Sequence, residues 1–262
     1  MSYSVYNFDN LPKDLDSDLV ETVDKIAKVA CHLSYLISIG SLSSISLNKK
    51  TSTNSDGDEQ KALDVYADEA YLTELKNSPV KFYASEEQDE VIDLESDGRL
   101  AIAIDPLDGS SNIDTNVSIG SIFSIRSIPN KQTWDKKDIF LAAGSEQIAA
   151  GYIIFGPQTM FVVTFGNGVK YYILDRNKNL FIDAKIETTI PADTREYAVN
   201  ASNARHWEKR IKNYIDDSIA GKSGPRGIDF NMRWVASLVA ETHRILSRGG
   251  IFIYPADSRK GY

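Results

Sequence analysis

The sequence predicts an α/β protein of the layered α+β kind, with stacked helices and sheets in two subdomains. Three observations predict it: two helix-spaced stretches near the N-terminus, a central series of short apolar segments separated by glycines, and alternating strand and helix patterns at the C-terminal end. The 262 residues are 42% hydrophobic and 25% charged, close to the average for globular proteins. A sizeable core can therefore form.

Two helices are expected first. Apolar residues recur at helical spacing in Leu15–Ile39, and Gly40 follows where a glycine commonly ends a helix. Residues Gln60–Lys76 again place apolar residues near one face. The polar run Asn48–Glu59 between them predicts a loop.

Seven short apolar segments follow, and each predicts a strand. They are Lys81–Ala84, Leu100–Ile104, Ile119–Ile128, Ala149–Phe155, Met160–Phe165, Lys170–Leu174 and Leu180–Ile182. The polar stretch Asp183–Arg195 predicts a boundary between a first domain, 1–187, and a second, 188–262. For the second domain we expect, in order, strand Tyr197–Asn200, helix Arg205–Ala220, helix Met232–Ser247 and strand Ile251–Tyr254.

Charge and cysteine content narrow the function classes. Lys and Arg total 29 against 37 Asp and Glu, and the net charge of −8 with no basic face does not favour nucleic-acid binding. No stretch is apolar enough for a membrane span or a secretory signal. Cys31 is the only cysteine, which excludes an intrachain disulfide, and we expect a cytoplasmic location. With three histidines besides, any metal would be held by oxygen.

Acidic residues gather in three segments, each at the start or end of a predicted strand or helix. The segments are GDEQKALD (57–64), SEE (85–87) and DPLDGSSNID (105–114). Carboxylates at the C-terminal ends of neighbouring strands can converge on one crevice. Taken singly, each segment is more simply interpreted as a surface loop, a strand end or a helix cap.

The third segment has the residues for phosphate chemistry. Asp105 and Asp108 lie three residues apart across a proline-stiffened turn, so both can face the same cations. Gly109 permits close approach of the backbone, and Ser110 and Ser111 are N-cap types that accompany anion sites. Hard divalent ions beside an anion site indicate metal-assisted phosphoryl transfer to water.

DPLDGSSNID, followed by VSIGSIF, resembles the signature of class I fructose-1,6-bisphosphatases within the lithium-sensitive, inositol monophosphatase-like phosphatase superfamily. The resemblance extends over nearly the whole chain, through GDEQKALDV (57–65), ASEEQ (84–88), IAAGYIIFG (148–156), NASNARHW (200–207), DFNMRWVASLVAETHRIL (229–246) and GGIFIYPADSRKGY (249–262). Inositol monophosphatase relatives usually carry Asp-Gly-Thr after the first aspartate, so the Ser-Ser-Asn continuation favours the fructose bisphosphatase branch.

This resemblance implies the sugar-phosphatase fold and hydrolysis of the 1-phosphate of fructose 1,6-bisphosphate, with Mg²⁺ or alternatively Mn²⁺ as cofactor, in gluconeogenesis or carbon fixation. It also implies a homotetramer. The implied metal ligands are Asp58, Glu86, Glu87, Asp105, the carbonyl of Leu107, and Asp108. Asp58 and Glu87 are implied to position the nucleophilic water as well, and Asp64 to help deprotonate it.

The same resemblance implies the substrate contacts. Asp108, Gly109, Ser110 and Ser111 match residues around the 1-phosphate. Asn200, Arg233 and Tyr254 match residues that bind the 6-phosphate, with the arginine supplied by a neighbouring subunit. Asn203 and Trp234 stand where the vertebrate form has phosphate-binding tyrosines, and they receive no role.

The sequence departs from the family at Tyr262, where family members continue with a substrate-binding lysine and a metal-ligating glutamate. The second domain is therefore expected to be incomplete. Two hypotheses follow: a fructose-1,6-bisphosphatase, or a non-catalytic truncated remnant that binds metal or phosphate. A phosphatase for inositol phosphates or nucleotides is a third, which Ser110 and Ser111 disfavour.

Overall fold

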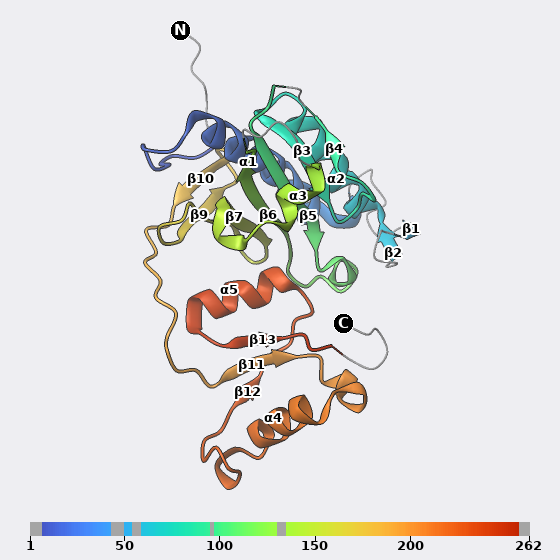
Figure 1. Cartoon of the computed structure of the whole chain (residues 1–262), viewed down its shortest axis with the longest axis vertical. Helices are drawn as coiled ribbons and strands as arrows, with labels where there is room; N and C mark the ends of the chain where they lie inside the picture. Colours follow the sequence, from blue (N-terminus) through green and yellow to red (C-terminus); the bar gives the residue numbers. More distant parts are fainter. Residues whose placement is uncertain (1–6, 43–49, 54–58, 95–96, 130–134, 257–262) are drawn as a thin grey trace. The chain divides into compact units, whose positions relative to one another are not determined.

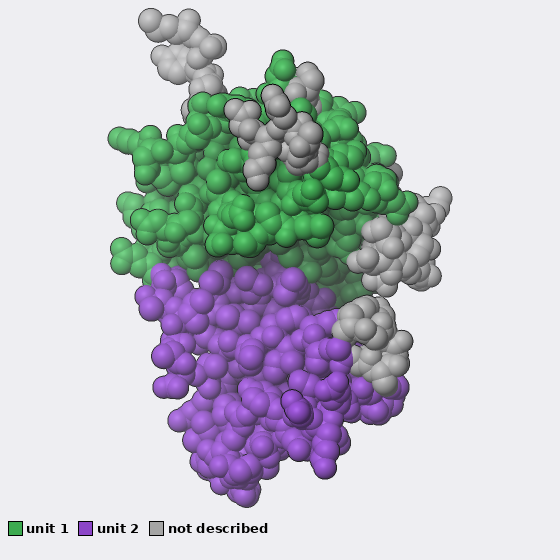
Figure 2. Space-filling view, viewed as in Figure 1, with its two compact units in different colours: residues 1–187 green, residues 188–262 purple. Residues whose placement is uncertain are grey.

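The computed structural model describes residues 7–42, 50–53, 59–94, 97–129 and 135–256. They form two compact units, residues 1–187 and 188–262, coloured separately in Figure 2. Each unit has its own sheet, and the mixture of sheets and helices confirms the layered α/β prediction. None of the described helices is long and apolar enough to cross a membrane.

Unit 1 is built on an eight-stranded sheet of order β10-β9-β8-β7-β6-β5-β3-β4 (Figure 1). The strands are β3 (Val80–Ser85), β4 (Ile92–Asp93), β5 (Leu100–Asp108), β6 (Ile119–Ser127), β7 (Gln147–Phe155), β8 (Thr159–Thr164), β9 (Lys170–Asp175) and β10 (Leu180–Asp183). All neighbours in this sheet pair antiparallel except β3 and β5, which are parallel. All seven predicted strands are confirmed.

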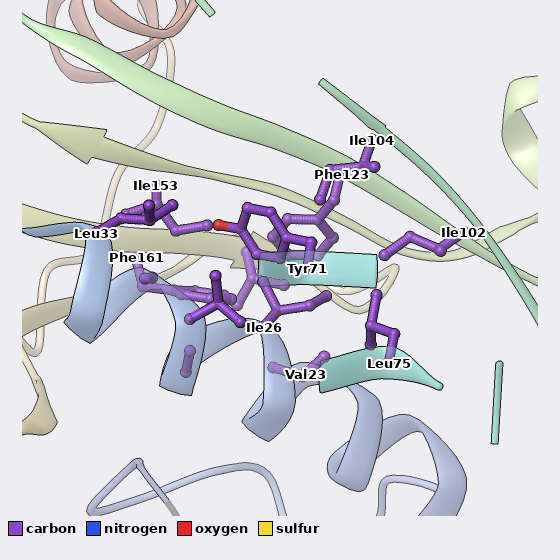
Figure 3. Close-up of a cluster of buried hydrophobic side chains, with 14 of the residues drawn as sticks. Val23, Ile26, Leu33, Tyr71, Leu75, Ile102, Ile104, Phe123, Ile153 and Phe161 are labelled. Atoms are coloured by element: carbon purple, nitrogen blue, oxygen red, sulfur yellow. The ribbon is translucent and has the colours of Figure 1, made fainter. Parts of the chain in front are cut away.

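Two helices, α1 (Ser17–Ile39) and α2 (Ala62–Leu75), cover one face of this sheet (Figure 1). The Asp16 side chain accepts a hydrogen bond from the Asp18 N–H and caps α1, and Gly40 follows its last turn with a φ of 50°. Figure 3 shows the core between helices and sheet, where Ile26 of α1 and Tyr71 of α2 meet Phe123 of β6. Burial of such a side chain contributes about 1.5–3 kcal/mol.

Several smaller elements of unit 1 were not predicted, among them strand β4. Helix α3 (Lys136–Leu141) packs Ile139 against Phe82 and Ala101 in a separate apolar cluster. Strands β1 (Lys50–Thr53) and β2 (Glu59–Lys61) pair antiparallel. The predicted loop 48–59 is therefore wrong for 50–53 and Glu59, and the predicted helix begins at Ala62 rather than at Gln60. The remainder of that loop, including Asp58, lies outside the described residues.

Unit 2 contains a three-stranded parallel sheet of order β12-β11-β13, with helices α4 and α5 on opposite sides (Figure 1). The elements are β11 (Glu196–Val199), α4 (Lys209–Ile219), β12 (Asn231–Met232), α5 (Leu238–Arg248) and β13 (Ile251–Ile253).

The helix predicted from Met232 begins six residues later, at Leu238. The reason is local. Ala236 has a φ of 59°, outside the helical range, and Ser237 caps α5 by accepting the Ala240 N–H at 3.3 Å. Arg233 therefore follows strand β12 and does not lie on a helix.

Candidate functional site

Two predicted acidic segments meet where β3 and β5 end. These strands are parallel neighbours, with Ser85 beside Ile104, and the Glu86 N–H donates to the Ile104 carbonyl at 3.2 Å. Glu86 therefore leaves the sheet beside Asp105. Ligand sites in α/β sheets form at such carboxyl ends of parallel strands.

Negative charge is crowded at this junction. The pKa of Asp105 is raised to about 9, mainly by burial and then by the nearby charges of Glu86 and Asp108 and a hydrogen bond to Glu86. The Leu107 N–H, which donates to Asp105 Oδ1 at 3.0 Å, acts in the opposite direction. This environment favours the protonated carboxyl group, and a cation beside it would favour the carboxylate.

Strand β5 is irregular within the DPLD sequence. Asp105 pairs with Ile122 and Asp108 pairs with Gly120, with a register shift between the two pairs. Proline has no N–H to donate, so Pro106 interrupts the ladder at this point. The prediction placed both aspartates after the strand, whereas β5 continues to Asp108.

A tight turn follows β5 at once. Gly109 adopts a left-handed conformation, with φ 78° and ψ 30°, and leads into a 3-10 turn over Ser110–Asn112. The Asn112 N–H donates to the Gly109 carbonyl at 2.8 Å, which closes the turn. Ser110 is half-buried and Ser111 is exposed, so the turn presents hydroxyl and N–H groups beside Asp108.

Asp64 and Glu87 are the two carboxylates that were predicted to be catalytic. Asp64 is only 2% exposed and lies in the first turn of α2. Glu87 is half-buried, and its N–H donates to the Ser85 hydroxyl at 3.2 Å.

The donors at the β3–β5 junction suit a hard divalent ion, because all of them are carboxylate or carbonyl oxygens. No three Asp, Glu, His or Cys side chains in the described part of the chain are arranged to hold a metal ion. The oxygen atoms of these residues are suitable ligands for a divalent ion, and the side chains of Glu86 and Asp105 form a hydrogen-bonded pair.

Unit 2 holds the three residues assigned to the second phosphate. The Asn200 side chain accepts from the Ser202 N–H at 3.2 Å and caps the turn after β11. The Arg233 N–H donates to the Tyr197 carbonyl at 2.7 Å, and its Nε lies 3.5 Å from Glu196 Oε1. These contacts fix the backbone at Arg233 and leave its side chain 49% exposed.

Tyr254 lies one residue beyond β13 and is 59% exposed. Its ring is parallel to that of Phe252, with centroids 6.3 Å apart, and Phe252 also stacks on Trp234 at 5.7 Å. Tyr254 can therefore pack its ring in this stack and still expose its hydroxyl group. Trp234, which received no role from sequence, supports the ring stack.

Sequence reasoning missed three residues that hold the site together. Asp68, Tyr71 and Ser121 are polar, buried and hydrogen-bonded to the acidic segments or to residues beside them. A signal for the first two was present, because Asp68 lies four residues after Asp64 and Tyr71 lies three residues after Asp68 on α2. Nothing local distinguishes Ser121 from other strand residues.

Comparisons with known proteins agree with one another. Residues 10–185 match the family described as Fructose-1-6-bisphosphatase, N-terminal domain, and residues 190–262 match its C-terminal domain. A class 1 fructose-1,6-bisphosphatase of Cereibacter sphaeroides is 51% identical over 97% of this chain and 75% of its own. One of Rhodobacter capsulatus is 53% identical over 95% and 73%. The chain thus spans about three quarters of these relatives.

Solved structures give the same result for the fold. The holo form of Leishmania major fructose-1,6-bisphosphatase superposes with a TM-score of 0.86 at 32% identity, over 95% of this chain and 77% of that one. The structure of the same enzyme in its T-state gives 0.81 at 31% identity, over 96% and 76%.

Proposed function

This chain belongs to the fructose-1,6-bisphosphatase family, and on that premise we propose that it hydrolyses the 1-phosphate of fructose 1,6-bisphosphate to fructose 6-phosphate and phosphate. The observation that supports this best is the junction of β3 and β5. There the charges of Glu86 and Asp108 both act on Asp105, and Asp108 directly precedes the Gly109–Asn112 turn. The relatives reported above do not favour an inositol or nucleotide phosphatase.

We assign Glu86, Asp105, Asp108 and the Leu107 carbonyl to the divalent metal, with Asp58 and Glu87 completing the set. When bound, a divalent cation supplies positive charge that stabilises the phosphoryl oxygens and favours ionisation of the attacking water. Mg²⁺ is the proposed ion, with Mn²⁺ as the alternative, because both prefer oxygen ligands.

The chain's own groups complete the reaction. Asp64 would accept the proton of the attacking water, which Glu87 orients. The backbone and hydroxyl donors of Gly109, Ser110 and Ser111 would hold the 1-phosphate, and their hydrogen bonds strengthen as charge develops on its oxygens.

For the 6-phosphate we assign Asn200, Arg233 and Tyr254. An exposed arginine whose backbone is fixed by Tyr197 suits a phosphate because its planar fork of donors matches the anion. We further propose that Arg233 serves a neighbouring subunit of a homotetramer. A cytoplasmic location is also proposed, since Cys31 alone forms no intrachain disulfide.

The test is phosphate release from fructose 1,6-bisphosphate, measured with Mg²⁺, with Mn²⁺ and with a chelator. Inositol 1-phosphate is the comparison substrate, and Asp105→Asn is the matched variant without the central carboxylate. Release that requires the metal, prefers the sugar bisphosphate and disappears in Asp105→Asn supports the proposal. Equal release in wild type and variant would show that the activity comes from another source.

A further inference from the structure

Helix α2 has one polar, buried side that faces the acidic junction. Asp64, Asp68 and Tyr71 are spaced by four and three residues, so they share a face of the helix. Asp64 and Asp68 are each 2% exposed and Tyr71 is 0% exposed. Burying a carboxylate is unfavourable unless hydrogen bonds satisfy its oxygens, so the partners of Asp68 matter.

The Asp68 carboxylate holds the turn that follows β3. The Ser85 hydroxyl donates to Oδ1 at 2.7 Å, and the Gln88 side-chain amide donates to Oδ2. The Ser85 oxygen in turn accepts the Glu87 N–H at 3.2 Å. Both ends of the four-residue turn are therefore tied to one buried group, and the two residues between them are Glu86 and Glu87.

Tyr71 reaches the other acidic segment from the same helix face. Its hydroxyl donates to Ser121 Oγ at 3.0 Å, and the Ser121 hydroxyl donates to the Pro106 carbonyl at 2.8 Å. That carbonyl lies inside the DPLD sequence, between Asp105 and Leu107. One side of α2 thus fixes the backbone of both segments that carry the proposed metal ligands.

We propose that Asp68 is a positioning residue for the metal site, which fixes the backbone of the turn from which Glu86 reaches Asp105. Tyr71 has the corresponding role for the Pro106 segment. This inference rests on the proposed function. Carboxylates placed together repel one another. Hydrogen bonds from α2 that fix the backbone of both segments keep these carboxylates within reach of a shared cation.

A purely structural role for Asp68 makes different predictions, and the chain offers a matched control. The Tyr83 hydroxyl also donates to Asp68 Oδ1, at 2.7 Å, and Tyr83 itself lies within β3, before the Glu86–Gln88 segment. Tyr83→Phe removes a donor from the same carboxylate and one contact of the Ser85 hydroxyl. It keeps the bonds from Ser85 and Gln88 to Asp68 and the bond from the Glu87 N–H to Ser85. Ser85→Ala removes a donor from Asp68 together with the acceptor of the Glu87 N–H.

The experiment compares wild type with Asp68→Ala, Asp68→Asn, Ser85→Ala and Tyr83→Phe. Three readouts are used: Mn²⁺ affinity by calorimetry, hydrogen exchange of residues 86–88 in metal-free protein, and the thermal midpoint. We expect Asp68→Ala and Ser85→Ala to weaken Mn²⁺ binding about 10–100-fold and to speed exchange in the turn. Tyr83→Phe should lower the thermal midpoint and keep wild-type Mn²⁺ affinity.

Asp68→Asn should restore Mn²⁺ affinity most of the way. Its amide oxygen can accept from Tyr83 and Ser85, and the Gln88 side chain can rotate to accept from the new amide N–H. Ser85→Ala keeps the test decisive if Asp68→Ala fails to fold, because Ser85 is only half-buried.

Unchanged affinity and exchange in Ser85→Ala, or equal loss in Ser85→Ala and Tyr83→Phe, would overturn the inference while metal binding by wild type stands. A wild-type chain that neither binds Mn²⁺ nor releases phosphate would overturn the proposed function, and the inference with it. The wild-type measurements therefore separate the two failures.

Discussion

Glu86 and Asp105 are joined by a side-chain hydrogen bond across the ends of two parallel strands. Two carboxyl groups can form this bond only when one of them carries a proton. Burial and the charges of Glu86 and Asp108 favour the protonated form of Asp105, and a cation bound between these carboxylates would favour the ionised form instead.

Asp105→Asn should abolish metal-dependent phosphate release and weaken Mn²⁺ binding without lowering the thermal midpoint. The amide occupies the same space and relieves repulsion from Glu86 and Asp108. Calorimetric titration and thermal unfolding measure the two effects. Asp89→Asn, which removes one charge from an exposed neighbouring position, is the control and should bind Mn²⁺ normally. Normal affinity in Asp105→Asn would mean that the metal binds elsewhere.

Arg233→Ala should raise KM for fructose 1,6-bisphosphate about 10–100-fold, since a hydrogen bond to a charged group contributes about 1.5–3 kcal/mol. Steady-state kinetics measure it, and fructose 1-phosphate, which lacks the second phosphate, should be almost unaffected. Arg248→Ala is the matched control, because Arg248 also pairs with Glu196, at 3.1 Å, and is 58% exposed. Equal losses in both variants, or with both substrates, would assign Arg233 a structural role.

The strands of unit 1 could be predicted because their signal is local. Apolar residues suited to a pleated, buried surface alternate with glycine turns, and each of the seven segments forms a strand within a few residues of its expected ends. The position of the acidic segments beside strand ends could also be predicted, because it depends on the same local signal. What brings Glu86 to Asp105 is the parallel pairing of β3 with β5, which no local pattern contains.

The errors have physical causes. The apolar spacing through Met232–Ser247 is compatible with one continuous helix. The positive φ of Ala236 and the Ser237 cap instead make α5 begin at Leu238. Asp68 received no role from the sequence. Its donors come from Ser85 and Gln88, seventeen and twenty residues away, so its burial depends on tertiary packing.

Arg244→Ala should destabilise the protein by about 3–5 kcal/mol, because it leaves a buried carboxylate without its cation. Glu241 is 0% exposed and pairs with Arg244 at 3.0 Å. Urea unfolding measures the change, and Arg248→Ala should cost less than about 1 kcal/mol because that pair is solvent-exposed. Glu241→Gln should lie between them, since its amide oxygen can still accept the Val235 N–H. Similar costs for the two arginines would contradict the argument.

His243 on α5 should make stability fall as the pH drops below 6.5. Burial lowers the pKa of its imidazole from the ordinary value of 6.5, so the unfolded chain binds the proton more tightly than the folded one. Above 6.5 the ring is neutral in both states and stability does not depend on it. Between 6.5 and the lower folded pKa, protonation favours unfolding.

The measurement is the thermal midpoint of wild type and His243→Gln at pH 7.5, 6.5 and 5.5. Carboxylates titrate in both proteins, so their contribution cancels in the difference between the two curves. Wild type should lose more stability than the variant between pH 6.5 and 5.5, because only wild type has an imidazole to protonate on unfolding. Parallel curves over that interval would show that His243 takes up a proton equally well in the folded chain.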